Sequence, residues 1–225
     1  MSTKPFICPY CNHGYSREST LVTHVCEQKR RALAQHDKHV IIAYDAFQRF
    51  YRRTMKAERT YEEFAKSPYY NAFVKFGSFV HNVNPLYPSN FIDYVINSGI
   101  KLDDWAKDSV YDKYVVDLLK TETVETALTR SINHMISWSE KSKEDWTEYF
   151  HKVSIPRFTY DVKDGKISPW ILLNAPSGKA LLNKLNDEQF TMIATAINPE
   201  FWIYKFNHLP ADLELARQVI KESKL

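Results

Sequence analysis

Hydrophobic residues recur at helical spacing along most of this chain. From His36 onward, Val40, Tyr44, Phe47 and Tyr51 are spaced four, three and four residues apart, so they form one stripe on a helix. The same period, together with capping residues and prolines that are typical of helix starts, predicts later helices. They cover residues 103–121, 123–141, 177–186, 187–197, 199–207 and 210–223. The pattern therefore predicts a mostly α fold.

Polar residues mark the starts of shorter helices. Thr60 stands three residues before Glu63, which is the spacing of a capping box. Ser67 precedes Pro68 and Ser168 precedes Pro169, and each pair is typical of an N-cap followed by the first helical residue. Ser89 is predicted to cap a further short helix.

One segment departs from the helical period. Residues 157–162 alternate between polar and apolar types, and Asp164-Gly165 is a signal for a tight turn. We therefore expect a short β-hairpin near 157–168.

Composition narrows the class of protein. The chain has 225 residues, of which 44% are hydrophobic and 14% aromatic, and this is enough for a packed core. Its 5 glycines are few for a β-sandwich or a phosphate-loop protein. No apolar run approaches the roughly 18 to 20 residues of a membrane span, and no apolar signal segment follows the N-terminus. We expect a soluble, cytoplasmic protein with no membrane partner.

Charge is distributed unevenly. Residues 1–60 contain 11 Lys and Arg against 5 Asp and Glu, a net charge of +6, whereas the remaining residues contain 19 against 22, a net charge of −3. A basic segment attracts nucleic acids or acidic protein surfaces. The basic part also contains all three cysteines, Cys8, Cys11 and Cys26.

The cysteines have the spacing of a metal site. Two residues separate Cys8 from Cys11, so a tight turn can aim both thiolates at one ion, and His24 offers a third ligand after a hairpin and the start of a helix. A unit of this size needs metal binding to supply its folding free energy. We predict a Zn²⁺ site formed by Cys8, Cys11, His24 and Cys26.

Residues 6–26 have the form F-x-C-x2-C-x3-Y-x5-L-x2-H-x-C. This resembles the zinc-finger family that uses two cysteines and two histidines, with Cys26 replacing the last histidine. The resemblance implies a small ββα zinc finger over about 1–30, with Phe6, Tyr15 and Leu21 as its miniature core.

The last two ligands depart from the family pattern, because only Val25 separates His24 from Cys26. Residues two apart on a helix point about 200° away from each other. The helix must therefore end or tighten at His24 if Cys26 is to turn back onto the ion. The alternative fourth ligands are His13, His36 and His39.

The resemblance also implies residues that contact nucleic acid. Arg17, Thr20 and Thr23 fall where the family places base-reading side chains, and one such finger covers about three base pairs. The connector that follows adds three cations that could contact phosphates, namely Lys29, Arg30 and Arg31. Four further cations on the next predicted helix could extend the same face: Arg49, Arg52, Arg53 and Lys56. The alternative is that all of these are solvent-facing residues that serve helix ends and solubility.

A second resemblance would cover most of the chain. Residues 61–77 and Lys166-Ile167-Ser168-Pro169-Trp170 are similar to segments of uncharacterised proteins encoded by large tailed phages. It implies a phage origin and a role in the cytoplasm of an infected bacterium, and it brings no activity with it.

These observations predict a zinc finger at 1–30 and a helical domain over 31–225. The leading functional hypothesis is non-enzymatic binding of DNA or RNA by the basic N-terminal part, with a possible protein partner for the helical domain. The rival is an interaction adaptor, or an assembly or structural phage protein, in which zinc stabilises a docking arm. An enzyme is the least favoured class, because no phosphate-loop, dinucleotide-binding or zinc-protease motif occurs.

Overall fold

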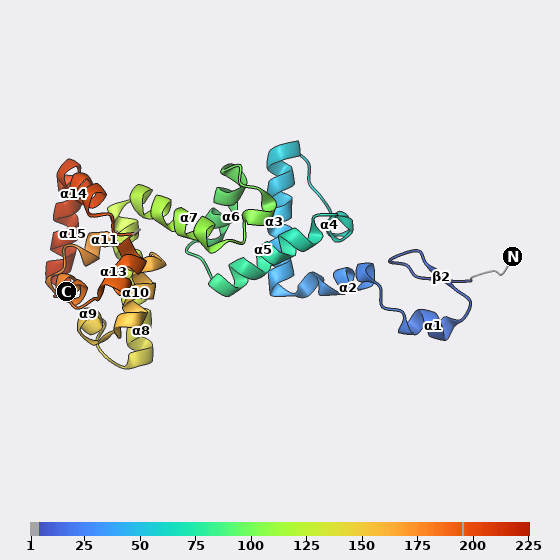
Figure 1. Ribbon diagram of the computed structural model, residues 1–225, viewed down its shortest axis with the longest axis horizontal. Helices are drawn as coiled ribbons and strands as arrows, with labels where there is room; N and C mark the ends of the chain where they lie inside the picture. Colours follow the sequence, from blue (N-terminus) through green and yellow to red (C-terminus); the bar gives the residue numbers. More distant parts are fainter. Residues whose placement is uncertain (1–4, 195) are drawn as a thin grey trace. The chain divides into compact units, whose positions relative to one another are not determined.

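The structure is a computed structural model that describes residues 5–194 and 196–225. Helices account for most of the described chain, and its one sheet is a two-stranded hairpin near the N-terminus (Figure 1). The predicted mostly α class is confirmed, and the hairpin lies in the N-terminal part that was predicted to be a small ββα unit. The chain divides into two compact units, one up to Val110 and one from Tyr111 onward, a division that the sequence pattern does not mark.

The N-terminal hairpin pairs β1 (Phe6–Ile7) with β2 (Gly14–Tyr15) in antiparallel register, so that Phe6 lies opposite Tyr15. The short helix α1 (Glu18–Thr23) follows and contacts both strands. Phe6, Tyr15 and Leu21 are half-buried, in the places predicted for a miniature core. We call residues 6–23 the ββα unit.

The rest of the first unit is helical. Its elements are α2 (Glu27–Leu33), η1 (Ala34–His36), α3 (Lys38–Met55), α4 (Tyr61–Lys66), α5 (Tyr70–Val83), α6 (Pro88–Asn97) and η2 (Leu102–Asp104). Helices α3 and α5 pack most closely against each other. A Cβ atom at Gly77 on α5 would lie 2.1 Å from the carbonyl oxygen of His39, so this crossing requires glycine.

Aromatic side chains fill the core between these helices. Phe47, Phe64, Phe73 and Trp105 are buried, and their rings meet mostly edge to face or tilted. The predicted stripe on α3 therefore faces the core through Val40 and Phe47, as its helical spacing requires.

The second unit contains the remaining helices. They are α7 (Asp108–Thr121), α8 (Val124–Ser142), η3 (Trp146–Glu148), α9 (Tyr149–Lys152), α10 (Ile155–Lys163), α11 (Pro169–Leu172), α12 (Pro176–Leu182), α13 (Asp187–Ala194), α14 (Pro199–His208) and α15 (Pro210–Ser223). The division between the units falls within the first turn of α7.

A buried carboxylate ties three of these helices together. Asp161 on α10 accepts hydrogen bonds from the hydroxyl of Tyr149 at 2.9 Å and from Nε of Arg157 at 2.8 Å, and Nε2 of His134 on α8 lies 2.8 Å away. Burial opposes ionisation of Asp161, but the groups on His134 and Arg157 outweigh it and lower the pKa of the carboxyl.

The hairpin predicted near 157–168 is wrong, because the first part of that segment is helix α10. Phe158 and Val162 are four residues apart and both are buried, so the apparent alternation contains a helical period. Pro156 lies in the first turn, where proline is tolerated, and Gly165 follows the helix with a φ of 71°. The Asp164-Gly165 pair therefore ends a helix rather than forming a hairpin turn.

The helix-start signals had mixed outcomes. The capping box of Thr60 and the N-cap of Ser168 are confirmed. Ser67 lies before α5 and its hydroxyl accepts the N–H of Tyr69, so it forms a turn and not the N-cap. Ser89 lies inside α6, which begins one residue earlier at Pro88. Among the described residues, no helix combines the length and apolar character that crossing a membrane needs.

Candidate metal centre

Two side chains of the ββα unit and two that follow it converge on one point. The sulfur atoms of Cys8, Cys11 and Cys26 and a ring nitrogen of His24 all lie within 4.8 Å of one another. Cys8 is 1% exposed and the other three are half-buried. Within the described chain, no other group of three or more cysteine, histidine or acidic residues is placed in this way.

A tight turn between the strands positions the first two cysteines. The N–H of Cys8 donates to the carbonyl oxygen of His13, and the N–H of Asn12 donates to that of Cys8, each at 2.9 Å. Asn12 takes the left-handed conformation with a φ of 59°, which asparagine tolerates better than most residues. The closed turn aims the sulfurs of Cys8 and Cys11 at the same point.

A break between two helices positions the other two ligands. Helix α1 ends at Thr23, and His24 has the extended angles φ −67° and ψ 125°. Cys26 is also extended and forms the N-cap of α2, where its sulfur accepts the N–H of Lys29 at 3.3 Å. The prediction that the helix must end at His24 is confirmed. The extended segment carries the Cys26 sulfur back to the ligands that come before it.

The spacing of the ligand atoms suits a four-coordinate ion. Metal bonds of about 2.3 Å to sulfur and about 2.0 Å to nitrogen place two tetrahedral ligands roughly 3.5 to 3.8 Å apart. The Sγ of Cys11 lies 3.3 Å from Nε2 of His24, which is slightly inside that spacing. The group could therefore hold one metal ion with small adjustments of its side chains.

Tyr15 supplies a contact that orients the imidazole. Its hydroxyl lies 2.7 Å from Nδ1 of His24, and the two rings are 5.0 Å apart. When Nε2 binds a metal ion, Nδ1 carries the proton and donates a hydrogen bond to the hydroxyl oxygen of Tyr15. The sequence predicts Tyr15 as a core residue but does not predict the contact of its hydroxyl with His24. The signal was the hydroxyl, which a purely apolar position does not need.

The thiol environments differ. Burial alone would raise the pKa of Cys8, but backbone N–H groups of Cys11 and Tyr10 outweigh it and lower that pKa. For Cys11, the backbone of His13 lowers the pKa, yet burial and the sulfurs of Cys8 and Cys26 raise it overall. The crowding of sulfurs favours a bound cation, whose charge would offset their mutual repulsion.

The histidines considered as alternative ligands lie outside the group. His13 is exposed, and the edge of its ring meets Tyr15 at 4.8 Å between centroids. His36 belongs to η1 and His39 to α3, in the helical part of the first unit. The structure thus places Cys26, and none of these three, with Cys8, Cys11 and His24.

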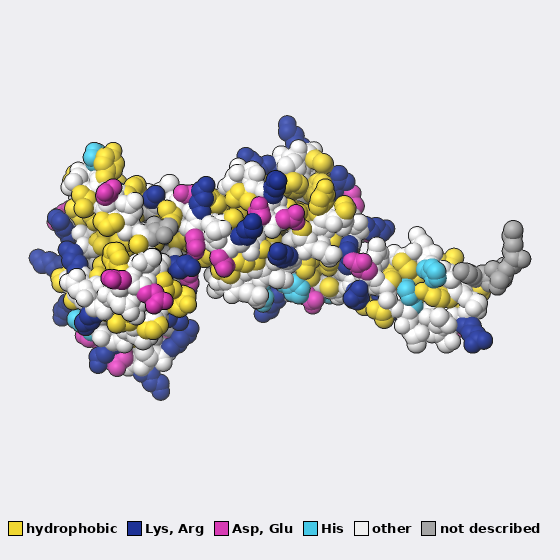
Figure 2. Space-filling model, in the orientation of Figure 1, with side chains coloured by type: hydrophobic (Ala, Val, Ile, Leu, Met, Phe, Trp, Pro, Cys, Tyr) yellow, Lys and Arg dark blue, Asp and Glu magenta, His cyan; other side chains and the backbone are white. Residues whose placement is uncertain are grey.

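The residues predicted to read bases lie at the two ends and in the middle of α1. Arg17 is its N-cap, Thr20 is in the middle, and Thr23 is its last residue. All three are exposed, although the hydroxyl of Thr23 donates back to the carbonyl oxygens of Ser19 and Thr20. Arg17 is the one Lys or Arg between Pro5 and Cys26. On the face drawn in Figure 2, charged side chains are accordingly sparse on the ββα unit.

The three cations of the connector have different environments. Arg30 is exposed, whereas Nζ of Lys29 donates to the carbonyl oxygen of His24 at 3.3 Å. The side chain of Arg31 is 13% exposed and pairs with Glu27. It also donates to the carbonyl oxygens of Ala65 and Ser67 at 2.9 and 3.3 Å.

The guanidinium of Arg31 lies 4.4 Å from the ring centre of Tyr70, and its own carbonyl oxygen accepts the hydroxyl of Tyr61. Arg31 therefore joins α2 to α4 and α5. Its predicted phosphate contact is at odds with this structure, because the side chain is already engaged within the protein.

Comparison of the chain with protein-family models, with curated proteins and with solved structures gave no match. The function is therefore argued from the residues of the site and from the charges near it.

Proposed function

We propose that the protein is a non-enzymatic zinc protein that binds nucleic acid through cations of its first 60 residues. The observation that carries the zinc assignment is the group of three sulfurs and one imidazole nitrogen within 4.8 Å of one another. Such a closed set of three cysteines and one histidine is typical of structural zinc, and thiolates disfavour harder ions such as Mg²⁺ or Ca²⁺.

Zinc has a structural role in this proposal. Helix α1 buries no residue, and the half-buried Phe6, Tyr15 and Leu21 are the only core that the ββα unit has besides Cys8. A unit of this size cannot offset its loss of conformational entropy by so little apolar burial. Metal binding supplies the missing free energy of folding.

Charge supports nucleic acid as the target. The net charge of +6 over residues 1–60 attracts a polyanion. Arg17 and Arg30 are both exposed, Arg17 as the N-cap of α1 and Arg30 on α2, so their side chains can reach phosphates. A single short helix cannot specify a site by itself, so we expect binding that depends strongly on salt and weakly on sequence.

The experiment is a titration of the zinc-loaded chain with a 20-base-pair DNA and a 20-nucleotide RNA at several salt concentrations. The logarithm of the association constant should fall linearly with the logarithm of salt concentration. Arg30→Gln should reduce that slope by about 0.9 on duplex DNA, because one phosphate contact is lost. A dissociation constant weaker than about 100 μM at low salt for both nucleic acids, the weak end of non-specific binding, would rule the proposal out.

A protein-docking function is the second candidate, and exposed apolar side chains favour it. Val22 on α1 and Val25 in the extended segment are 70% and 65% exposed, and Ile7 on β1 is 58% exposed. Apolar surface on so small a unit is typical of a protein contact. The double variant Val22→Ser/Val25→Ser should keep the salt-dependent titration unchanged if nucleic acid is the target. Failure of the wild-type chain to bind either nucleic acid would favour the docking function.

A further inference from the structure

We propose that a cleft at the C-terminal end of α3 is a second contact site for a nucleic-acid backbone, in which Arg53 and Lys56 bind phosphates. This inference rests on the proposed function and assigns it a place in the helical part of the first unit. Figure 2 shows Lys and Arg side chains gathered at the upper end of α3, away from its junction with α2.

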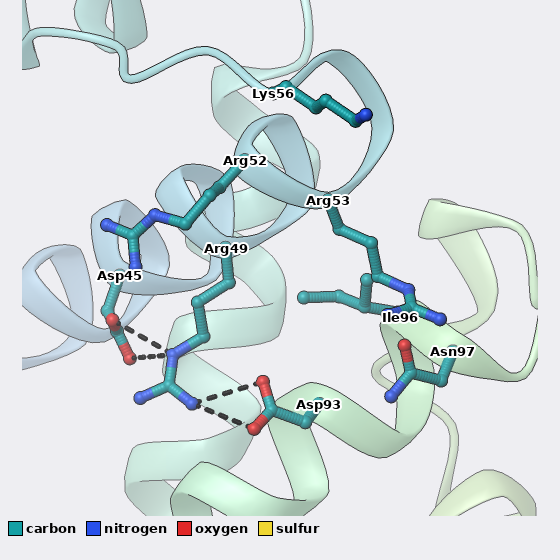
Figure 3. Close-up of a pocket in the computed structure, with 8 residues that line it drawn as sticks. All are labelled: Asp45, Arg49, Arg52, Arg53, Lys56, Asp93, Ile96 and Asn97. Atoms are coloured by element: carbon teal, nitrogen blue, oxygen red, sulfur yellow. Dashed lines mark hydrogen bonds and ion pairs between the residues drawn. The ribbon is translucent and has the colours of Figure 1, made fainter.

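The cleft lies between α3 and α6 and has a volume of about 630 Å³ (Figure 3). Four cations of α3 and its C-cap line it, Arg49, Arg52, Arg53 and Lys56. Helix α6 contributes Asp93, Ile96 and Asn97 on the other side. The cations are thus arranged around a hollow and not along a flat helix face.

Arg49 is already engaged within the protein. Its guanidinium pairs with Asp45 at 3.0 Å and with Asp93 at 3.1 Å, and it reaches the carbonyl oxygen of Ser89 at 3.4 Å. Pairing with Asp45 raises the pKa of Arg49. Arg49 therefore joins α6 to α3, and the two carboxylates are occupied by it.

The side chains of the other three cations, Arg52, Arg53 and Lys56, are not neutralised by a close carboxylate among the described residues. Arg52 meets Glu58 only at 3.5 Å, and both side chains are exposed, so that pair contributes little. In the described part of the chain, no ion pair or hydrogen bond engages the side chain of Arg53 or Lys56. Figure 3 shows both side chains directed away from the carboxylates of Asp45 and Asp93.

Helix-end electrostatics explain only part of this arrangement. Cations in the last turn of α3 interact favourably with its macrodipole. However, Arg52, Arg53 and Lys56 are within four residues of one another, and like charges at that spacing repel. Asn97, which lines the cleft from α6, adds an amide that can donate a hydrogen bond (Figure 3). Two free cations and an amide around a hollow suit phosphate oxygens.

The lining favours a nucleic-acid backbone over other anions. Ile96 is the one aliphatic side chain among the residues that line the cleft, and none of them is aromatic. Protein interfaces rely on aromatic and apolar anchors, and small-molecule pockets are mostly apolar and enclose their ligand. A phosphodiester chain needs neither, because it offers repeated charges to exposed cations.

The test compares two double variants of the zinc-loaded full chain. Arg53→Gln/Lys56→Gln removes the two free cations of the cleft. Lys141→Gln/Lys143→Gln is the matched control, because Lys143 is the exposed left-handed C-cap of α8, with a φ of 60°, as Lys56 is of α3, with a φ of 53°. Both variants remove two charges from a helix end, and thermal unfolding should show that both remain folded.

We expect the cleft variant to lower the salt slope on duplex DNA by up to about 1.8, two contacts at about 0.9 each, whereas the control keeps the wild-type slope. A wild-type slope in the cleft variant would overturn this inference and leave the proposed function intact. Absence of nucleic-acid binding by the wild-type chain would overturn both. If the cleft variant loses binding to polyglutamate but keeps its DNA slope, the cleft binds acidic protein and the inference is wrong.

Discussion

The hydrogen bond between Tyr15 and His24 gives the sharpest prediction for the metal centre. Tyr15→Phe removes the hydroxyl that lies 2.7 Å from Nδ1 of His24. It keeps the aromatic ring, whose centroid lies 5.0 Å from that of His24 and whose packing supports the ββα unit. The substitution therefore isolates the hydrogen bond from the burial of the ring.

The size of the effect follows from the environment of the bond. Loss of a partner that orients a metal-bound histidine typically costs 10- to 100-fold in metal affinity. Tyr15 and His24 are half-buried, so water can replace part of the lost bond. We therefore expect the zinc dissociation constant to rise by about tenfold, the lower end of that range.

The assay is competition for zinc between the protein and a chelator of known affinity under reducing conditions. Tyr10→Phe is the matched control, because Tyr10 lies between the first two cysteines and is 37% exposed. Its variant should keep the wild-type affinity. Equal affinity of Tyr15→Phe and wild type, within about twofold, would refute the orienting role, and an equal loss in both variants would show a general effect of removing a hydroxyl.

Three further predictions concern the helical part. Arg31→Ala should lower the free energy of unfolding by about 1 to 3 kcal/mol, because it breaks several contacts of a mostly buried side chain. Arg30→Ala should change that free energy by less than about 0.5 kcal/mol. Urea unfolding measures both, and equal effects would contradict the inward placement of Arg31. Gly77→Ala should cost about 3 kcal/mol, because the new Cβ meets backbone, while Gly99→Ala, in open space at positive φ, should cost about 1 kcal/mol in thermal unfolding. The lowered pKa of Asp161 means that its ion pairs stabilise the fold at neutral pH, and this contribution is lost as pH falls through the folded-state pKa. Asp161→Asn should therefore be less stable at pH 7, and its free energy of unfolding should fall less steeply with decreasing pH. An acid dependence equal to that of the wild type would contradict this prediction.

The helices could be predicted from the sequence where the apolar period was long or the cap was explicit. The stripe on α3 and the capping box of Thr60 are examples, because each signal has one structural solution. The segment 157–168 was misinterpreted because a short run of alternating residues also fits a helix that buries Phe158 and Val162. Tertiary burial decides between helix and strand in such a segment, and a short stretch of sequence does not contain that information.

The metal group could be predicted because its chemistry is local. Cys8, Cys11, His24 and Cys26 lie within 19 residues, and the close spacing of the last two already required the break after α1. The inward role of Arg31 could not be predicted, since its partners Ala65 and Ser67 follow more than 30 residues later. The cleft beside Arg53 likewise depends on α6, which long-range packing brings to α3.

The central claim is that one zinc ion is bound by three thiolates and one imidazole, and cobalt substitution tests it most directly. Titration of the reduced, metal-free chain with Co²⁺ should saturate at one ion per chain, give the charge-transfer absorption of three thiolates, and be reversed by Zn²⁺. Cys26→Ala should weaken that absorption, whereas His36→Ala should leave it unchanged, because His36 lies outside the group. A spectrum of only two thiolates in the wild-type chain, or no saturable binding, would contradict the account.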